Sequence, residues 1–229
     1  KKNATLLKLL KTTNKASEIS VLSNQTSTFK QPLFIDSLLN TKQLTNYLVF
    51  DVDVSQENIL LNGITKAADS TKSLINVFAN TTPHANELAL ITPNNSDGFL
   101  SITYNDFEIF QENLNNFNKK TSTKKETLLF DNVTEVGVIY NDANAYVLNT
   151  IDAELTKTAL QEEQTNIETY RSIPIYTFSK TAILKNHFTP FINQEVTMYC
   201  QLDQFFVFST SIETLQNIIA NYQNKTTLY

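Results

Sequence analysis

Residues 202–222, LDQFFVFSTSIETLQNIIANY, read as a strand followed by a capped helix. The first part, residues 204–209, combines aromatic and β-branched residues, which favours a strand. Thr210 or Ser211 can N-cap the helix, because a side-chain oxygen at that position accepts a free backbone N–H. One face of the helix should be buried against strands, because its apolar residues recur at helical spacing. These residues are Ile212, Leu215, Ile218, Ile219 and Tyr222.

A stretch farther upstream repeats this organisation at an offset of 105 residues. Residues 99–104 read as a strand that leads into a helix capped by Asn105 or Asp106. Glu108 then corresponds to Glu213. The apolar residues of the upstream helix are Phe107, Phe110, Leu114 and Phe117. The agreement suggests an internal repeat of a strand–helix unit.

The rest of the chain alternates strand-like runs with helices. Residues 19–22, 47–54, 59–65 and 128–130 read as strands, and residues 32–40 include a single helical turn. The helix that begins at residue 152 should turn Leu155, Ala159 and Leu160 inward. Helix starts fall near residues 69, 106, 152, 181 and 211, mostly after two strand-like runs. Residues 86–92 read as one such strand, and the polar run at 94–98 reads as a hairpin turn. A strand–strand–helix unit cannot bury its helix alone, so the sheets of several units must join. The sequence therefore predicts an α+β fold, a mainly antiparallel sheet of repeated β-β-α units. Helices pack on one face, and the other face meets solvent or a partner.

The same pattern suggests three segments along the chain. Residues 1–45 form an N-terminal extension with one or two strands, and residues 46–119 form a first β-β-α half. Residues 127–229 form the second half, and the basic polar loop 118–126 lies between the halves. The two halves form either one compact domain or two tightly packed ones.

Composition limits the classes of partner. The chain has 229 residues, of which 41% are apolar, and this is enough for a sizeable core. Its formal charge of -5 argues against a nucleic-acid partner, which would need a strongly basic face. No apolar stretch approaches the roughly 20 residues of a transmembrane segment. The chain begins at Lys1 without Met, so we expect a larger parent chain.

The residue types that mark common active sites are scarce. The three glycines, Gly63, Gly98 and Gly137, lie far apart, which excludes glycine-rich phosphate and dinucleotide loops and predicts no cofactor of that kind. Cys200 lies in an apolar run and is interpreted as a buried small hydrophobe. His84 and His187 form no metal-binding pair along the sequence, so we expect them at the surface or at a helix end. No catalytic or metal-binding residue is therefore assigned.

One acidic group offers an alternative. Asp51 and Asp53 share one face of a predicted strand, about 6.5 Å apart, and Glu57 follows closely. Paired carboxylates of this kind serve metal-dependent hydrolases and nucleases, which use them to hold divalent ions. The simpler interpretation is an alternating strand, with Val52 and Val54 inward and both aspartates in water.

The chain is rich in Asn and Thr, poor in glycine, and builds a hairpin before a capped helix, as in FFVFSTSIETLQNII. From about Tyr47 onward, this pattern resembles large bacterial cell-envelope proteins of unknown function. The resemblance implies an extracytoplasmic module, with a lipid anchor as one option, and it supplies no catalytic residue. We therefore expect a non-enzymatic binding or scaffolding module that binds a protein or another envelope component. Such a module should expose a sheet face or edge rich in Thr, Tyr and Phe, and should lack a deep polar pocket.

Overall fold

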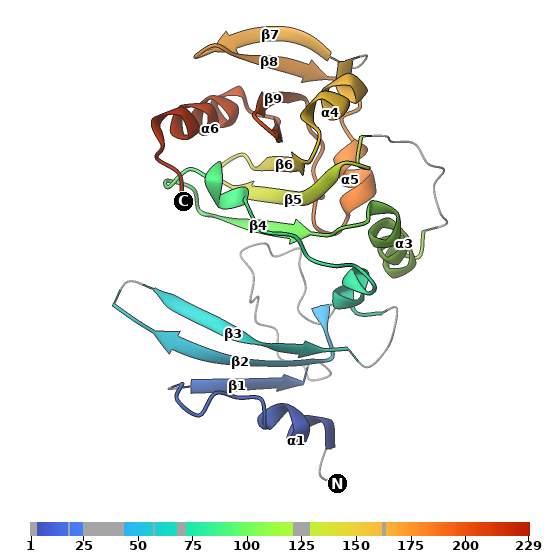
Figure 1. Ribbon diagram of the computed structural model, residues 1–229, viewed down its shortest axis with the longest axis vertical. Coiled ribbons are helices and arrows are strands. Elements are labelled where there is room, and N and C mark those ends of the chain that lie inside the picture. Colours follow the sequence, from blue (N-terminus) through green and yellow to red (C-terminus); the bar gives the residue numbers. More distant parts are fainter. Residues whose placement is uncertain are drawn as a thin grey trace. The chain divides into compact units, whose positions relative to one another are not determined.

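The computed structural model describes residues 4–17, 19–24, 44–56, 58–67, 72–120, 129–161 and 164–229. Contacts within the chain divide it into two compact units, Lys1–Ala79 and Asn80–Tyr229. Figure 1 shows the elements of each unit. The sequence placed the boundary between its two halves at residues 118–126. The strands that come before and after these residues, β4 (Gly98–Thr103) and β5 (Val133–Tyr140), pair with each other.

The first unit is built around a three-stranded antiparallel sheet of order β1-β2-β3. Its described elements are α1 (Ala4–Leu10), β1 (Ile19–Asn24), β2 (Tyr47–Val54), β3 (Ile59–Lys66) and the 3₁₀ helix η1 (Leu74–Phe78). The strand-like runs predicted around residues 19–22, 47–54 and 59–65 are therefore confirmed. The helix predicted from residue 69 is a 3₁₀ turn where it is described, and its predicted cap lies outside the described residues.

The second unit contains a seven-stranded antiparallel sheet of order β4-β5-β6-β10-β9-β8-β7. Its strands are β4 (Gly98–Thr103), β5 (Val133–Tyr140), β6 (Ala145–Thr150), β7 (Gln164–Tyr170), β8 (Ile173–Phe178), β9 (Met198–Leu202) and β10 (Phe205–Ser209). Its helices are the 3₁₀ helix η2 (Leu88–Leu90), α3 (Phe107–Asn118), α4 (Ala153–Leu160), α5 (Ile183–Phe188) and α6 (Ile212–Asn224). The fold is α+β and mainly antiparallel sheet, as predicted.

The stretch that opened the sequence analysis forms β10 and α6. The Ser211 hydroxyl accepts the Thr214 N–H at 3.1 Å and caps α6, while Leu215, Ile218 and Ile219 are fully buried. Asp106 and Asp152 cap α3 and α4 through the same N-cap-to-N3 bond, each at 3.0 Å. These caps satisfy N–H groups that have no partner inside the helix.

Both faces of the central strands are buried, since every residue of β6 and β10 is buried. One face packs against α6 and contains Val207 and Cys200. The opposite face carries the aromatic contacts of Tyr199 with Phe206 and Phe208. The face expected to meet solvent or a partner is thus filled by the chain's own side chains at the centre of this sheet.

The predicted strand at residues 86–92 is wrong. Leu88–Leu90 form the 3₁₀ helix η2, and β4 pairs with β5 rather than with this segment. Two distant residues determine this conformation. The buried Glu135 carboxylate accepts the N–H groups of Glu87 and Leu88, and Leu88 packs directly over Gly137.

Two smaller predictions also fail. Leu155 of α4, expected to point inward, is 56% exposed, and the buried residues of that helix are Thr156 and Leu160. Residues 129–130, expected to belong to a strand, form a turn before β5. The single helical turn expected at residues 32–40 lies outside the described residues.

Candidate binding surface

The three-stranded sheet has one uncharged face, which we call the open face. The register aligns Ile19 with Val52, Val52 with Leu61, and Val54 with Ile59, so their side chains project to the same side. The apolar members of the open face are Ile19, Val21, Leu48, Phe50, Val52, Val54, Ile59 and Leu61. Each of these side chains is exposed or only partly buried.

β3 is the most exposed part of this sheet. Ile59 is 65% exposed, and seven of the eight residues of the strand are exposed. Leu60 and Ile64, which project to the face opposite the open face, are exposed as well. Large apolar side chains gathered in this way mark interaction sites more often than ordinary surface does.

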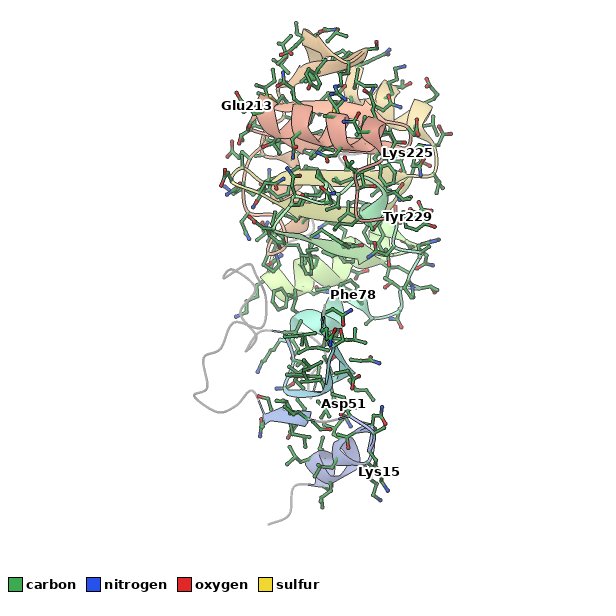
Figure 2. All side chains as sticks on the ribbon, turned by 90° about the vertical axis from the view of Figure 1, so that its left-hand side faces the viewer. Lys15, Asp51, Phe78, Glu213, Lys225 and Tyr229 are labelled. Carbon is green, nitrogen blue, oxygen red and sulfur yellow. The ribbon has the colours of Figure 1, made fainter. Side chains whose placement is uncertain are left out.

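The two aspartates singled out from the sequence lie on β2, on the face opposite the open face. Asp51 is a structural residue: its carboxylate accepts the Ser20 hydroxyl at 2.5 Å and the Asn14 N–H at 2.7 Å. It therefore ties the turn after α1 to the sheet (Figure 2). Asp53 is exposed, and Glu57 lies outside the described residues.

Their valine neighbours differ from the simple strand interpretation. Val54 is 55% exposed, whereas the sequence placed Val52 and Val54 inward. Val52 and Asp51 are both half-buried, and the turn after α1 covers the Asp51 side of the sheet. The exposed face is also aliphatic, with Phe50 as its one aromatic residue, rather than rich in Thr, Tyr and Phe.

The second unit contains a buried carboxylate that sequence reasoning missed. Glu135 on β5 is 1% exposed and has four donors: the N–H groups of Glu87 and Leu88, the Ser101 hydroxyl at 2.6 Å, and the Asn149 side-chain amide at 3.0 Å. A buried carboxylate needs such donors, because an unpaired charge there is costly. The network fastens the segment before β4 to the sheet, which gives the buried Glu135 a structural role.

A polar cleft of about 430 Å³ lies where the turns before β4 and β6 meet the start of α6. Its carboxylates are Asp97, Asp142 and Glu213, and all three are exposed. Glu213 accepts the Ser211 hydroxyl at 2.8 Å, and hydrogen bonds to its own backbone N–H and to this hydroxyl lower its pKa. Figure 2 places Glu213 at one end of α6 and Lys225 at the other. An acidic group at a helix start complements the helix dipole, which gives Glu213 a structural role at the start of α6.

The cysteine and the histidines occupy the expected structural positions. Cys200 is fully buried, and burial raises the pKa of its thiol to about 12, which leaves it protonated and unreactive at neutral pH. His84 is exposed in a loop. His187 lies in the last turn of α5, with Nδ1 2.9 Å from the Ile183 carbonyl oxygen.

The described residues contain no group of three or more His, Cys, Asp or Glu side chains placed to hold a metal ion. No helix in the described part of the chain has both the length and the apolar character needed to cross a membrane.

Comparison of the chain with models of known families, with curated proteins and with solved structures finds no match.

Proposed function

We propose that this chain is a non-enzymatic binding or scaffolding module of a bacterial cell-envelope protein, and that its open face docks an apolar surface of a partner protein. The observation that carries the proposal is the open face itself. Three strands present it without a charged side chain, and Ile19, Val54, Ile59 and Leu61 are each more than half exposed. Burying such side chains in a complex is favourable, at about 25 cal/mol per Å² of apolar surface.

The extracytoplasmic location rests on the resemblance of the Asn- and Thr-rich, glycine-poor sequence to envelope proteins. The internal repeat is part of the same proposal. It is supported by the starts of α3 and α6, whose caps Asp106 and Ser211 lie at the offset of 105 residues. Each helix also ends at a lysine in the left-handed conformation, Lys119 and Lys225, although α6 is one residue longer. Duplication of one strand–helix unit accounts for both helices.

The alternative of a metal-dependent hydrolase would use Asp51, Asp53 and Glu57. Asp51 already accepts two hydrogen bonds from the chain, and Asp53 is exposed to water. Nothing among the described residues favours this alternative over binding at the open face.

Two variants of matched exposure test the proposal. Val54→Lys places a charge on the open face, and Leu155→Lys places one on an exposed apolar site of the second unit; these positions are 55% and 56% exposed. The full chain, with either substitution or neither, is purified from the envelope fraction of its own host, and co-purified proteins are quantified by mass spectrometry. An unpaired charge buried in an interface costs enough to lower affinity at least about tenfold.

For at least one envelope protein, we expect the co-purified amount to fall at least about tenfold with Val54→Lys and to stay unchanged with Leu155→Lys. The proposal fails if every co-purified protein keeps its yield with Val54→Lys. It fails equally if both lysine variants reduce the same proteins to the same extent.

A further inference from the structure

We infer that the outer edge of β3 pairs with β3 of a second copy of this chain, antiparallel and about a two-fold axis through Asn62. The result would be one continuous six-stranded sheet formed by two three-stranded ones. This surface is the strand edge, which is distinct from the open face, so either proposal can fail without the other.

The first step is the unused backbone of β3. Among the described residues, β3 pairs with β2 alone, and the pairing runs from Ile59 to Lys66 without a register shift. The Ser55 N–H donates to the Asn58 carbonyl oxygen at 2.9 Å at the start of the hairpin. Hydrogen-bonded and non-hydrogen-bonded pairs alternate from that point, so residues 59, 61, 63 and 65 direct their N–H and C=O groups away from β2.

The second step is the absence of features that protect an edge. Natural sheets block their edge strands with charges, proline or bulges. Residues 59–65, ILLNGIT, contain no charge and no proline, and the register shows no bulge. A regular, uncharged and apolar edge of this kind is suited to accept another strand.

The third step is self-complementarity, which selects a second copy as the partner. A two-fold axis at Asn62 pairs Leu60 with Ile64 of the other copy, and Ile64 with Leu60. It also sets the two Asn62 side-chain amides opposite each other, and each amide can both donate and accept a hydrogen bond. The Asp51 carboxylate beside Asn62 accepts the Ser20 hydroxyl and the Asn14 N–H.

Charge fixes the direction of the pairing. Lys66 ends β3, and Asp53 lies at the hairpin end of the same face; both are exposed. Antiparallel pairing brings Lys66 of one copy toward the hairpin end of the other, which carries Asp53. Parallel pairing would place the two lysines side by side, and like charges directly opposite each other are unfavourable.

Single cysteines test the geometry directly. In the proposed pairing, residue 62 faces residue 62 of the second copy as a non-hydrogen-bonded pair, with Cα atoms about 4.5 Å apart, a separation that permits a disulfide. Residue 60 faces residue 64, so two cysteines at position 60 would be about 13 Å apart along the strand, too far to bond. Asn62→Cys and Leu60→Cys are therefore a matched pair on the same face, and the buried Cys200 can stay in place.

The experiment oxidises both variants of the full chain under mild conditions, after its mass in solution has been measured by light scattering. We expect twice the chain mass of 26.0 kDa before oxidation, and a disulfide-linked dimer with Asn62→Cys that is at least about tenfold more abundant than with Leu60→Cys. A monomer at high concentration overturns the inference. Equal cross-linking of both variants overturns it as well, because that result indicates parallel or random association.

Discussion

Gly137 shows how one missing side chain positions a distant segment. A Cβ atom at this residue of β5 would lie 2.4 Å from Leu88 Cδ2 and 2.7 Å from Leu88 Cδ1. Leu88 is fully buried, so a shift of its side chain away from the new methyl group would press on other core residues. The glycine therefore allows η2 to pack onto the sheet at the place where Glu135 binds the N–H groups of Glu87 and Leu88.

Gly137→Ala should lower the free energy of unfolding by about 1–3 kcal/mol, because an added methyl group overpacks a filled core. Leu88→Ala alone should cost about 2–5 kcal/mol through the cavity that it leaves. The free energy of unfolding of the double variant should fall by less than the sum of the two single losses, because the new methyl group enters that cavity. Urea denaturation of the four proteins, followed by far-UV circular dichroism, measures all three differences. Strict additivity would show that Gly137 and Leu88 do not pack as described.

At the scale of elements, the β7–β8 hairpin is built with an unfavourable turn. Tyr170 pairs with Ile173, which leaves a two-residue connection of Arg171 and Ser172, with φ values of 48° and 69°. Two-residue hairpin turns need positive φ at both positions, and glycine adopts it without steric cost. Arg171 has a compensating role, because its guanidinium donates to the Asn224 side-chain oxygen at 3.0 Å and holds the hairpin against the end of α6.

Ser172→Gly should therefore raise the free energy of unfolding by about 0.5–1 kcal/mol, because it removes left-handed strain without removing the Arg171 contact. Ser179→Gly is the matched control, since Ser179 follows β8 and is not among the residues with positive φ. Glycine there should leave stability unchanged or lower it, through the added freedom of the unfolded chain. Thermal or urea unfolding compares the two variants, and an equal effect of both would contradict the role assigned to the turn.

These elements show which parts of the fold local sequence determines. The strand and helix of residues 202–222 carry their own periodicity and cap, so their existence and burial follow from the sequence alone. Residues 86–92 carry an apolar run that fits a strand equally well. Their real conformation depends on Glu135 and Gly137, more than 40 positions away in the chain. The sequence has no local signal for such contacts.

The sequence predicted the type of candidate surface, an exposed sheet face or edge, but not which side chains form it. Alternation correctly placed β2 and β3, and an exposed sheet face or edge was expected. The turn after α1 covers the face of the sheet that carries Asp51, and the sequence could not show this. Val54 and Ile59 project from the other face and are exposed. The choice between the two faces of a strand depends on what packs against them, and periodicity does not contain that information.

At the scale of the whole molecule, one large buried cluster of the second unit is built from that unit's own residues. The buried cluster that joins Leu88, Val207 and Ile219 draws all its members from residues 88–219. The division of contacts after Ala79 agrees with this, because Asn80–Tyr229 includes both the η2 segment and β4. A fragment that begins at residue 127, the second half suggested by the sequence, lacks both.

Residues 80–229 should therefore fold alone, with cooperative unfolding and a urea midpoint close to that of the same transition in the full chain.

Residues 127–229 should not fold alone, for two reasons. Glu135 would lose the Glu87 and Leu88 N–H groups and the Ser101 hydroxyl, and a buried carboxylate stripped of its donors costs about 3–5 kcal/mol. β5 would also become a bare edge, with Val136 and Val138 uncovered by β4. The chain has no Trp, so far-UV circular dichroism provides the measurement for both fragments and the full chain. Cooperative unfolding of residues 127–229 at the midpoint of the longer fragment would contradict the role given to the η2 segment and β4.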